Sequence, residues 1–293
     1  MEIRFLGKTP LAKIVECFNE AFADYVVPFQ VEEKQIRRRW LSSRVDYGLS
    51  YGAFDDDRLV GFMMTGVDRW NGRRTAYNSG TGVIPSYRGQ RIVQQLYKKA
   101  LPSFRENSIE QCMLEVIVGN DQALNAYKRV GFQQKRTLKS YSLKQDLITE
   151  LPGDLQFKQV FRANWPAYRE LLEYETSWEN HRAAVAFLGK EIAVWEMYQG
   201  EDLLGFFIIK PGSGHLLQFG VKNHADWLAA GQQLLQQAAR VNARLLVNNV
   251  DERAEHSLRI LEETGLENSV DLYELELDLL AGKKRRWSLF RRS

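Results

Sequence analysis

The sequence predicts an α/β protein, in which two copies of one mixed and mostly antiparallel sheet are each flanked by helices. Strand-like segments alternate with amphipathic helical segments, and the same order of segments occurs in both halves of the chain. Two short motifs also recur, residues 57–62 at 201–206 and residues 127–132 at 261–266. The length of 293 residues corresponds to about two domains.

Two hairpins are predicted in the first half. Apolar segments at 50–54 and 59–67 are separated by three aspartates, which is typical of a turn between strands. Asn71-Gly72 then predicts a type I′ turn, which requires two residues with positive φ, leading into a strand over 74–84. Pro85 ends this strand because proline lacks the N–H that a ladder needs.

A helix follows this strand, since apolar residues form one stripe over 92–101. The sequence next predicts a buried strand over 113–118 and a helix over 121–130. Gly131 ends that helix, and a further strand covers 132–143.

The second half repeats this order. Its predicted strands and helices lie at 192–198, 203–210, 216–221, 225–240 (helix), 245–249, 252–264 (helix) and 272–279. The linker is placed at Leu151-Pro152-Gly153-Asp154. The predicted organisation is a first domain over 1–150, a second over 153–280 and a basic C-terminal tail over 281–293.

Charge and composition exclude several classes of protein. The net charge of +3 comes from the tail, which holds six basic and no acidic side chains, whereas residues 1–282 hold 34 basic and 37 acidic ones. A nucleic-acid-binding body is therefore not expected, and a solvated terminus is the favoured interpretation of the tail over contact with lipid or nucleic acid. Apolar runs are far shorter than the ~20 residues of a membrane span. Two cysteines suit a cytoplasmic protein.

The segment over 82–93 carries the clearest chemical signal. A strand stops, a short loop with Arg88 and Gly89 follows, and a helix begins. Helix N-termini present unpaired N–H groups and partial positive charge, which suit a phosphate or pyrophosphate. An ordinary strand-to-helix turn is the alternative.

These residues resemble the GNAT acetyltransferase superfamily. The resemblance covers roughly residues 1–145. It rests on Val83-Ile84-Pro85, on Arg88-Gly89-Gln90-Arg91-Ile92-Val93, and on Asn120, Tyr127, Gly131 and Phe132.

The resemblance implies a binding site for acetyl-CoA. The backbone around Val83 would pair with the pantetheine arm, and Asn120 would hydrogen-bond it. Tyr127 would protonate the departing thiolate as general acid, a role that a phenol with a pKa near ~10 can fill; packing in the core is the alternative. The N–H groups that would cradle the pyrophosphate belong to Arg88, Gly89, Gln90, Arg91, Ile92 and Val93.

The chain departs from the family pattern at two loop positions and at the expected position of the general base. Arg91 stands where the family has glycine, and Val93 stands where the family has glycine or alanine. The strand over 74–84 carries no carboxylate, where many members place the general base. Glu115 on the next strand is a candidate base, with a salt-bridged or edge carboxylate as the alternative and a water chain as another route for the proton.

The second half lacks these groups. Lys222-Asn223-His224-Ala225-Asp226 replaces the Arg-Gly loop, and Leu261 takes the place of Tyr127. Residues 153–280 are interpreted as a degenerate copy. None of the four histidines has metal-site spacing, so no metal is expected.

The expected function is acetyl-CoA-dependent transfer of an acetyl group to a primary amine by direct attack. The acceptor is a small amine, a peptide or a protein amine, and residues 18–40, with Tyr25 and Phe29, are expected to line its site. The alternative is a non-catalytic acyl-CoA sensor or scaffold. The sequence specifies neither the acceptor nor the oligomeric state.

Overall fold

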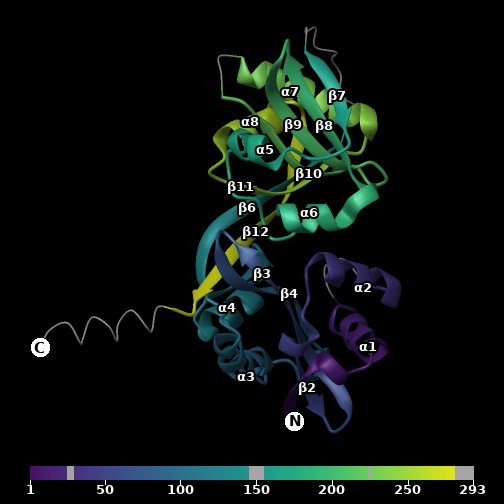
Figure 1. Ribbon diagram of the computed structural model, residues 1–293. Coiled ribbons are helices and arrows are strands. Elements are labelled where there is room, and N and C mark those ends of the chain that lie inside the picture. The colour runs from purple at the N-terminus through teal and green to yellow at the C-terminus, as the bar shows by residue number, and fades with distance from the viewer. Residues whose placement is uncertain (25–29, 145–154, 224–225, 281–293) are drawn as a thin grey trace, which may run out of the picture. The chain divides into compact units, whose positions relative to one another are not determined.

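The computed structural model describes residues 1–24, 30–144, 155–223 and 226–280, which form two compact units (Figure 1). Unit 1 comprises Met1–Lys135 and Glu274–Ser293, and unit 2 comprises Arg136–Tyr273. The predicted linker at 151–154, the basic tail and the acceptor-site residues Tyr25 and Phe29 lie outside the described residues. The domain boundaries of 1–150 and 153–280 therefore stay a prediction.

Unit 1 contains a mixed sheet with the strand order β1-β2-β3-β4-β5-β12. Its strands are β1 (Glu2–Phe5), β2 (Tyr51–Asp55), β3 (Arg58–Trp70), β4 (Arg73–Val83), β5 (Gln111–Ile117) and the end of β12 (Leu266–Asp278). The pairs from β1 to β4 are antiparallel, and β4 pairs with β5 in parallel. The predicted turn between β3 and β4 is confirmed, with φ of 49° at Asn71 and 76° at Gly72.

Helices cover both faces of the unit 1 sheet (Figure 1). They are α1 (Leu11–Ala21), α2 (Glu33–Ser42), α3 (Ile92–Glu106) and α4 (Asp121–Val130), with short 3-10 turns at η1 (Leu6–Lys8), η2 (Tyr47–Leu49) and η3 (Pro85–Tyr87). A Cβ on Gly82 would lie 2.9 Å from Ala21 of α1, and one on Gly61 would lie 3.2 Å from Ile92 of α3. The sheet thus packs α1 closely on one face and α3 on the other.

Unit 2 repeats this topology with the strand order β12-β6-β11-β10-β9-β8-β7. Its strands are β6 (Gln133–Leu143), β7 (Gln156–Val160), β8 (Ala193–Gln199), β9 (Asp202–Lys210), β10 (His215–Val221), β11 (Leu246–Asp251) and the beginning of β12. β7 to β10 pair antiparallel, and β10 pairs with β11 in parallel, as β4 does with β5. The predicted repeat of one α/β fold is confirmed.

Alternating side chains of β9 build the two cores of unit 2. The helices of unit 2 are α5 (Trp165–Leu171), α6 (Arg182–Leu188), α7 (Trp227–Val241) and α8 (Glu255–Glu263), with a 3-10 turn at η4 (Gly189–Glu191). Phe206 and Ile208 lie in one core with Tyr168 of α5, whereas Phe207 and Ile209 lie in the other with Leu234 of α7. The period of two along β9 therefore gives each helical layer its own apolar contact.

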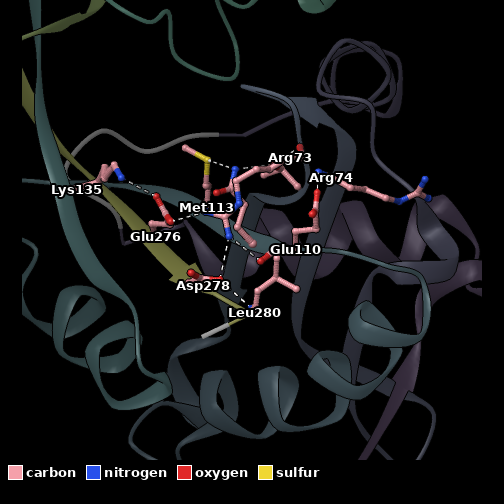
Figure 2. Close-up of polar contacts among 10 residues, drawn as sticks. Arg73, Arg74, Glu110, Met113, Lys135, Glu276, Asp278 and Leu280 are labelled. Carbon is pink, nitrogen blue, oxygen red and sulfur yellow. Dashed lines mark hydrogen bonds and ion pairs between the residues drawn. The ribbon is translucent and has the colours of Figure 1, made fainter. Parts of the chain in front are cut away.

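Unit 1 is completed by a strand from the far end of the chain, held by Arg73 (Figure 2). The Arg73 guanidinium pairs with Glu276 at 3.0 Å and with Asp278 at 2.9 Å, and it donates to the Glu110 carbonyl at 3.0 Å. Lys135 pairs with the other Glu276 oxygen at 3.2 Å. These contacts fix the end of β12 beside β5.

Candidate active site

β4 and β5 are paired in the middle of unit 1 and then diverge. Their parallel register runs from Thr75 opposite Gln111 to Tyr77 opposite Met113, while β4 continues to Val83 and β5 to Ile117. The β3–β4 register also shifts by one residue directly after this point, which leaves Ser79 as a bulge. Bulges turn a strand and redirect its side chains. Beyond Tyr77 the edge of β4 is therefore suited to pairing with an extended ligand.

The loop before α3 presents backbone N–H groups. Gly89 has φ of 80° and Arg91 has φ of 58°, and α3 begins at Ile92 without a side-chain cap. The first N–H to bond within the helix is that of Gln95, which donates to the Arg91 carbonyl at 3.1 Å. The N–H groups of the first turn are thus left outside the helical ladder, at the end that favours anions.

The Arg88 side chain is bound to other residues of unit 1. Its guanidinium donates to both carboxylate oxygens of Asp24, at 2.6 and 2.8 Å, and to the Val83 carbonyl at 3.2 Å. The hydrogen bond from Arg88 lowers the pKa of Asp24 below its ordinary value. An anion at this loop would therefore meet mainly backbone N–H groups, and the Arg91 side chain in the same loop is exposed.

Tyr127 lies where β4 and β5 diverge. It is 9% exposed, and its hydroxyl oxygen lies 3.4 Å from the Asn78 side-chain nitrogen. Asn78 directly follows Tyr77, the last β4 residue in the ladder with β5. The ring is therefore packed in the core, while the hydroxyl faces the end of the ladder, and the acid role of Tyr127 stays a prediction.

Asn120 precedes α4, and Glu115 lies on β5. The Asn120 side chain caps α4 by accepting from the Ala123 N–H at 3.1 Å. An Asn side chain also carries two amide donors, which remain suited to a ligand carbonyl. Glu115 lies half-buried on β5, between Leu114 and Val116.

Sequence reasoning did not find Asn78, Thr81 or Tyr97, which form one polar cluster with Tyr127. Tyr97 was assigned only to the apolar stripe of its helix, and burial raises its pKa well above the ordinary value. The available signal was an Asn within a predicted strand, since Asn is depleted in strands.

In the corresponding part of unit 2, a segment of unit 2 lies between the two parallel strands and hydrogen-bonds both. The β10–β11 register ends at Leu216 opposite Val247. Beyond it, Asn180 donates to the Asn248 carbonyl of β11 at 2.9 Å and accepts from the Gln218 side chain of β10. Neighbouring Trp178 is fully buried. Residues 177–180, called here the bridging segment, thus join the two strands where those of unit 1 diverge.

The position of Tyr127 is occupied by Leu261 in unit 2. Leu261 is fully buried within the apolar core beneath α7 and α8. A leucine carries no proton donor, so α8 offers no counterpart to the phenol on α4.

Two classes of feature are absent from the described residues. Among residues 1–24, 30–144, 155–223 and 226–280, no group of three or more His, Cys, Asp or Glu side chains is arranged to hold a metal ion. Over the same ranges, no helix is long and apolar enough to cross a membrane.

The first half of the chain is similar to known acetyltransferases. Residues 14–132 match the model of the acetyltransferase (GNAT) family. Over 95 residues, 32% of this chain, the sequence is 30% identical to N-alpha-acetyltransferase 30 of Schizosaccharomyces pombe and to N-alpha-acetyltransferase MAK3 of Arabidopsis thaliana. The match spans 63% and 50% of the length of those relatives.

Solved structures extend the fold to both halves. A GCN5-related N-acetyltransferase from Sphaerobacter thermophilus matches with a TM-score of 0.71 and 14% identity, covering 94% of this chain and 95% of that one. A tandem GNAT protein from the clavulanic acid biosynthesis pathway matches with a TM-score of 0.67 and 13% identity, covering 94% and 98%. Likeness at this identity shows the fold alone, and it confirms the predicted fold class over the chain.

Proposed function

We propose that unit 1 transfers the acetyl group of acetyl-CoA to a primary amine. The observation that carries this proposal is the meeting of three features: a β4 edge leaving its ladder, an uncapped α3 N-terminus, and the Tyr127 hydroxyl at the point of divergence. An extended thioester with an anionic far end matches the first two features, and a departing thiolate matches the third.

The loop before α3 fits the pyrophosphate of that substrate. No atom lies within 4 Å of the place where a Cβ on Gly89 would stand. In our assignment, the N–H groups over Arg88, Gly89, Gln90, Arg91, Ile92 and Val93 hold the pyrophosphate. The backbone of Val83 and the amide of Asn120 bind the pantetheine arm.

The reaction is direct attack of a neutral amine on the thioester carbonyl. The new C–N bond forms as the C–S bond breaks, and the electron pair of that bond goes to sulfur. Tyr127 gives its proton to the sulfur, and the proton lost by the amine nitrogen passes to a base. Glu115 is the candidate for that base, directly or through water.

The acceptor is proposed to be an α-amino group. Both curated relatives carry the name N-alpha-acetyltransferase. Free peptide N-termini are therefore the first acceptors to test, ahead of small amines. A cytoplasmic location stays a prediction.

Unit 2 is proposed to bind no acetyl-CoA. Support comes from the bridging segment, which hydrogen-bonds both β10 and β11, and from Leu261 at the place of Tyr127. In this proposal, one chain binds one substrate molecule.

A coupled assay tests the proposed function. Purified protein, acetyl-CoA and a panel of free-amino peptides and small amines are incubated, and released thiol and an acetyl mass gain on the acceptor are measured. Thiol release matched by acetylated acceptor supports the transferase. Tight acetyl-CoA binding without acetylation of any panel member would favour the non-catalytic acyl-CoA sensor.

A further inference from the structure

Asn78 occupies an unusual place on β4. It pairs with Thr65 of β3, and the bulge at Ser79 separates this pair from the next one, Met64 with Gly80. Asn78 and Ser79 therefore contact different neighbours: Ser79 hydrogen-bonds Ser43 at 2.7 Å, whereas Asn78 contacts residues of α3 and α4. The bulge thus aims one amide side chain at the Tyr127 hydroxyl.

The orientation of this amide is fixed by a neighbour that can only donate. The backbone N–H of Gly80 donates to the Asn78 side-chain oxygen at 3.0 Å. The Thr81 hydroxyl lies beside both amide atoms, 3.0 Å from the oxygen and 2.7 Å from the nitrogen. The side-chain nitrogen then faces the hydroxyls of Tyr97 at 3.1 Å and Tyr127 at 3.4 Å. Because an amide nitrogen donates and does not accept, it meets Tyr127 as a donor to the phenol oxygen.

Tyr127 is further held by aromatic edges. The Tyr97 and Phe132 rings meet it in T-shaped contacts, with centroid distances of 6.2 and 5.9 Å. The ring position is therefore set by packing, while the Asn78 side-chain amide contacts the hydroxyl.

We propose that Asn78 is a positioning residue for Tyr127, a role that rests on the proposed function. By donating to the phenol oxygen, Asn78 leaves the phenol proton for the departing sulfur. Once the proton has moved, the phenolate oxygen carries the charge, and a hydrogen bond to a charged acceptor is stronger than one to a neutral acceptor. The 3.4 Å separation is long for the resting state, and contacts of this kind tighten when the substrate is bound.

Two substitutions remove the donor in different ways. Asn78→Asp keeps the shape and the acceptor for Gly80 but replaces the donor with a carboxylate oxygen. Asn78→Leu removes the donor without adding charge. Ser79→Ala is the matched control, because it removes a buried hydrogen bond from the same bulge on the side of Ser43.

The first readout is the titration of Tyr127 itself, without substrate. Protein labelled with ¹³C at the tyrosine Cζ is titrated by NMR, and Tyr127→Phe identifies the signal. We expect Asn78→Asp to move the Tyr127 titration upward by at least one pH unit, since a donor is lost and a negative charge is added. We expect Asn78→Leu to move it in the same direction by less and Ser79→Ala to leave it in place. An unmoved Tyr127 signal in Asn78→Asp overturns the proposal.

The second readout is a double-mutant cycle on turnover of the peptide that the wild-type protein acetylates best. Asn78→Asp should lower kcat about 10- to 100-fold while the KM for acetyl-CoA stays within about two-fold, the range expected for a hydrogen bond to a charged group. In the Tyr127→Phe background it should change kcat by less than about two-fold, because residues that act as a unit are not additive.

The outcomes separate this inference from the proposed function. If Asn78→Asp lowers kcat by the same factor with and without the Tyr127 hydroxyl, Asn78 only shapes the strand, and the positioning role is wrong while the transferase stands. If wild-type protein acetylates no peptide or amine, the proposed function fails, and a catalytic positioning role fails with it. An unmoved titration contradicts the positioning role alone.

Discussion

Arg73 should contribute measurably to the stability of unit 1, because it fixes the end of β12. Its side chain is 31% exposed and pairs with Glu276, which is 16% exposed, and Asp278, which is 40% exposed. After solvent screening each pair contributes about 0.5 kcal/mol. The hydrogen bond to the Glu110 carbonyl adds about 1 kcal/mol.

Replacing Arg73 by Ala is therefore expected to lower the free energy of unfolding by about 2 kcal/mol. Arg74→Ala is the matched control, because it removes the same charge from the adjacent position, and the hydrogen bond of residue 74 to Glu110 uses the backbone N–H. Urea unfolding followed by circular dichroism measures both variants at low and at high salt. Equal losses in the two variants, or no loss in Arg73→Ala, would refute the role of Arg73.

Three further predictions concern the site and the pH dependence of stability. Tyr127→Phe should lower kcat about 100-fold or more without weakening acetyl-CoA binding measured by calorimetry. The control is Tyr141→Phe, which changes a buried tyrosine of unit 2 and should lower kcat by less than about two-fold. Equal losses in binding and turnover for Tyr127→Phe would contradict the acid role. Gly89→Val should weaken acetyl-CoA binding at least about tenfold, because a branched residue at φ of 80° strains the loop, and unchanged calorimetric affinity would count against the loop. Burial raises the pKa of Asp251, but hydrogen bonds from Arg253 and Arg136 outweigh this effect and lower the pKa to about 2. The stability that the ionised carboxylate provides is therefore complete at a pH above the ordinary aspartate pKa of about 3.9, and it is lost as the pH falls toward 2. Asp251→Asn should therefore unfold in urea with a smaller loss of stability between pH 5 and 2.5 than wild type, and identical acid sensitivity would argue against the depressed pKa.

Local sequence signals predicted much of the fold. Asn71-Gly72 and Gly131 have the positive φ values that their turns require, and the predicted helix over 121–130 coincides with α4. These features depend on residues close together in the chain. The four-residue strand β1 and the seven-residue helices α5 and α6 were not predicted, since such short elements carry too few periods of an apolar pattern.

Long-range pairing explains what the sequence did not reveal. The periodic segment at 272–279 was assigned to the second half, yet its end completes unit 1 through Arg73, which is 203 positions before Glu276. Likewise, the orientation of Asn78 depends on a register shift against β3. Neither the partner of an edge strand nor a bulge follows from local spacing.

Calorimetric titration of the full chain with acetyl-CoA distinguishes one binding site per chain from two or none. We expect one binding site per chain, and we expect Gly89→Val to abolish or strongly weaken it. Two sites per chain would contradict the proposed role of the bridging segment in unit 2. No heat of binding together with no thermal stabilisation would contradict an acetyl-CoA site at the loop before α3, and with it the proposed acetyl transfer.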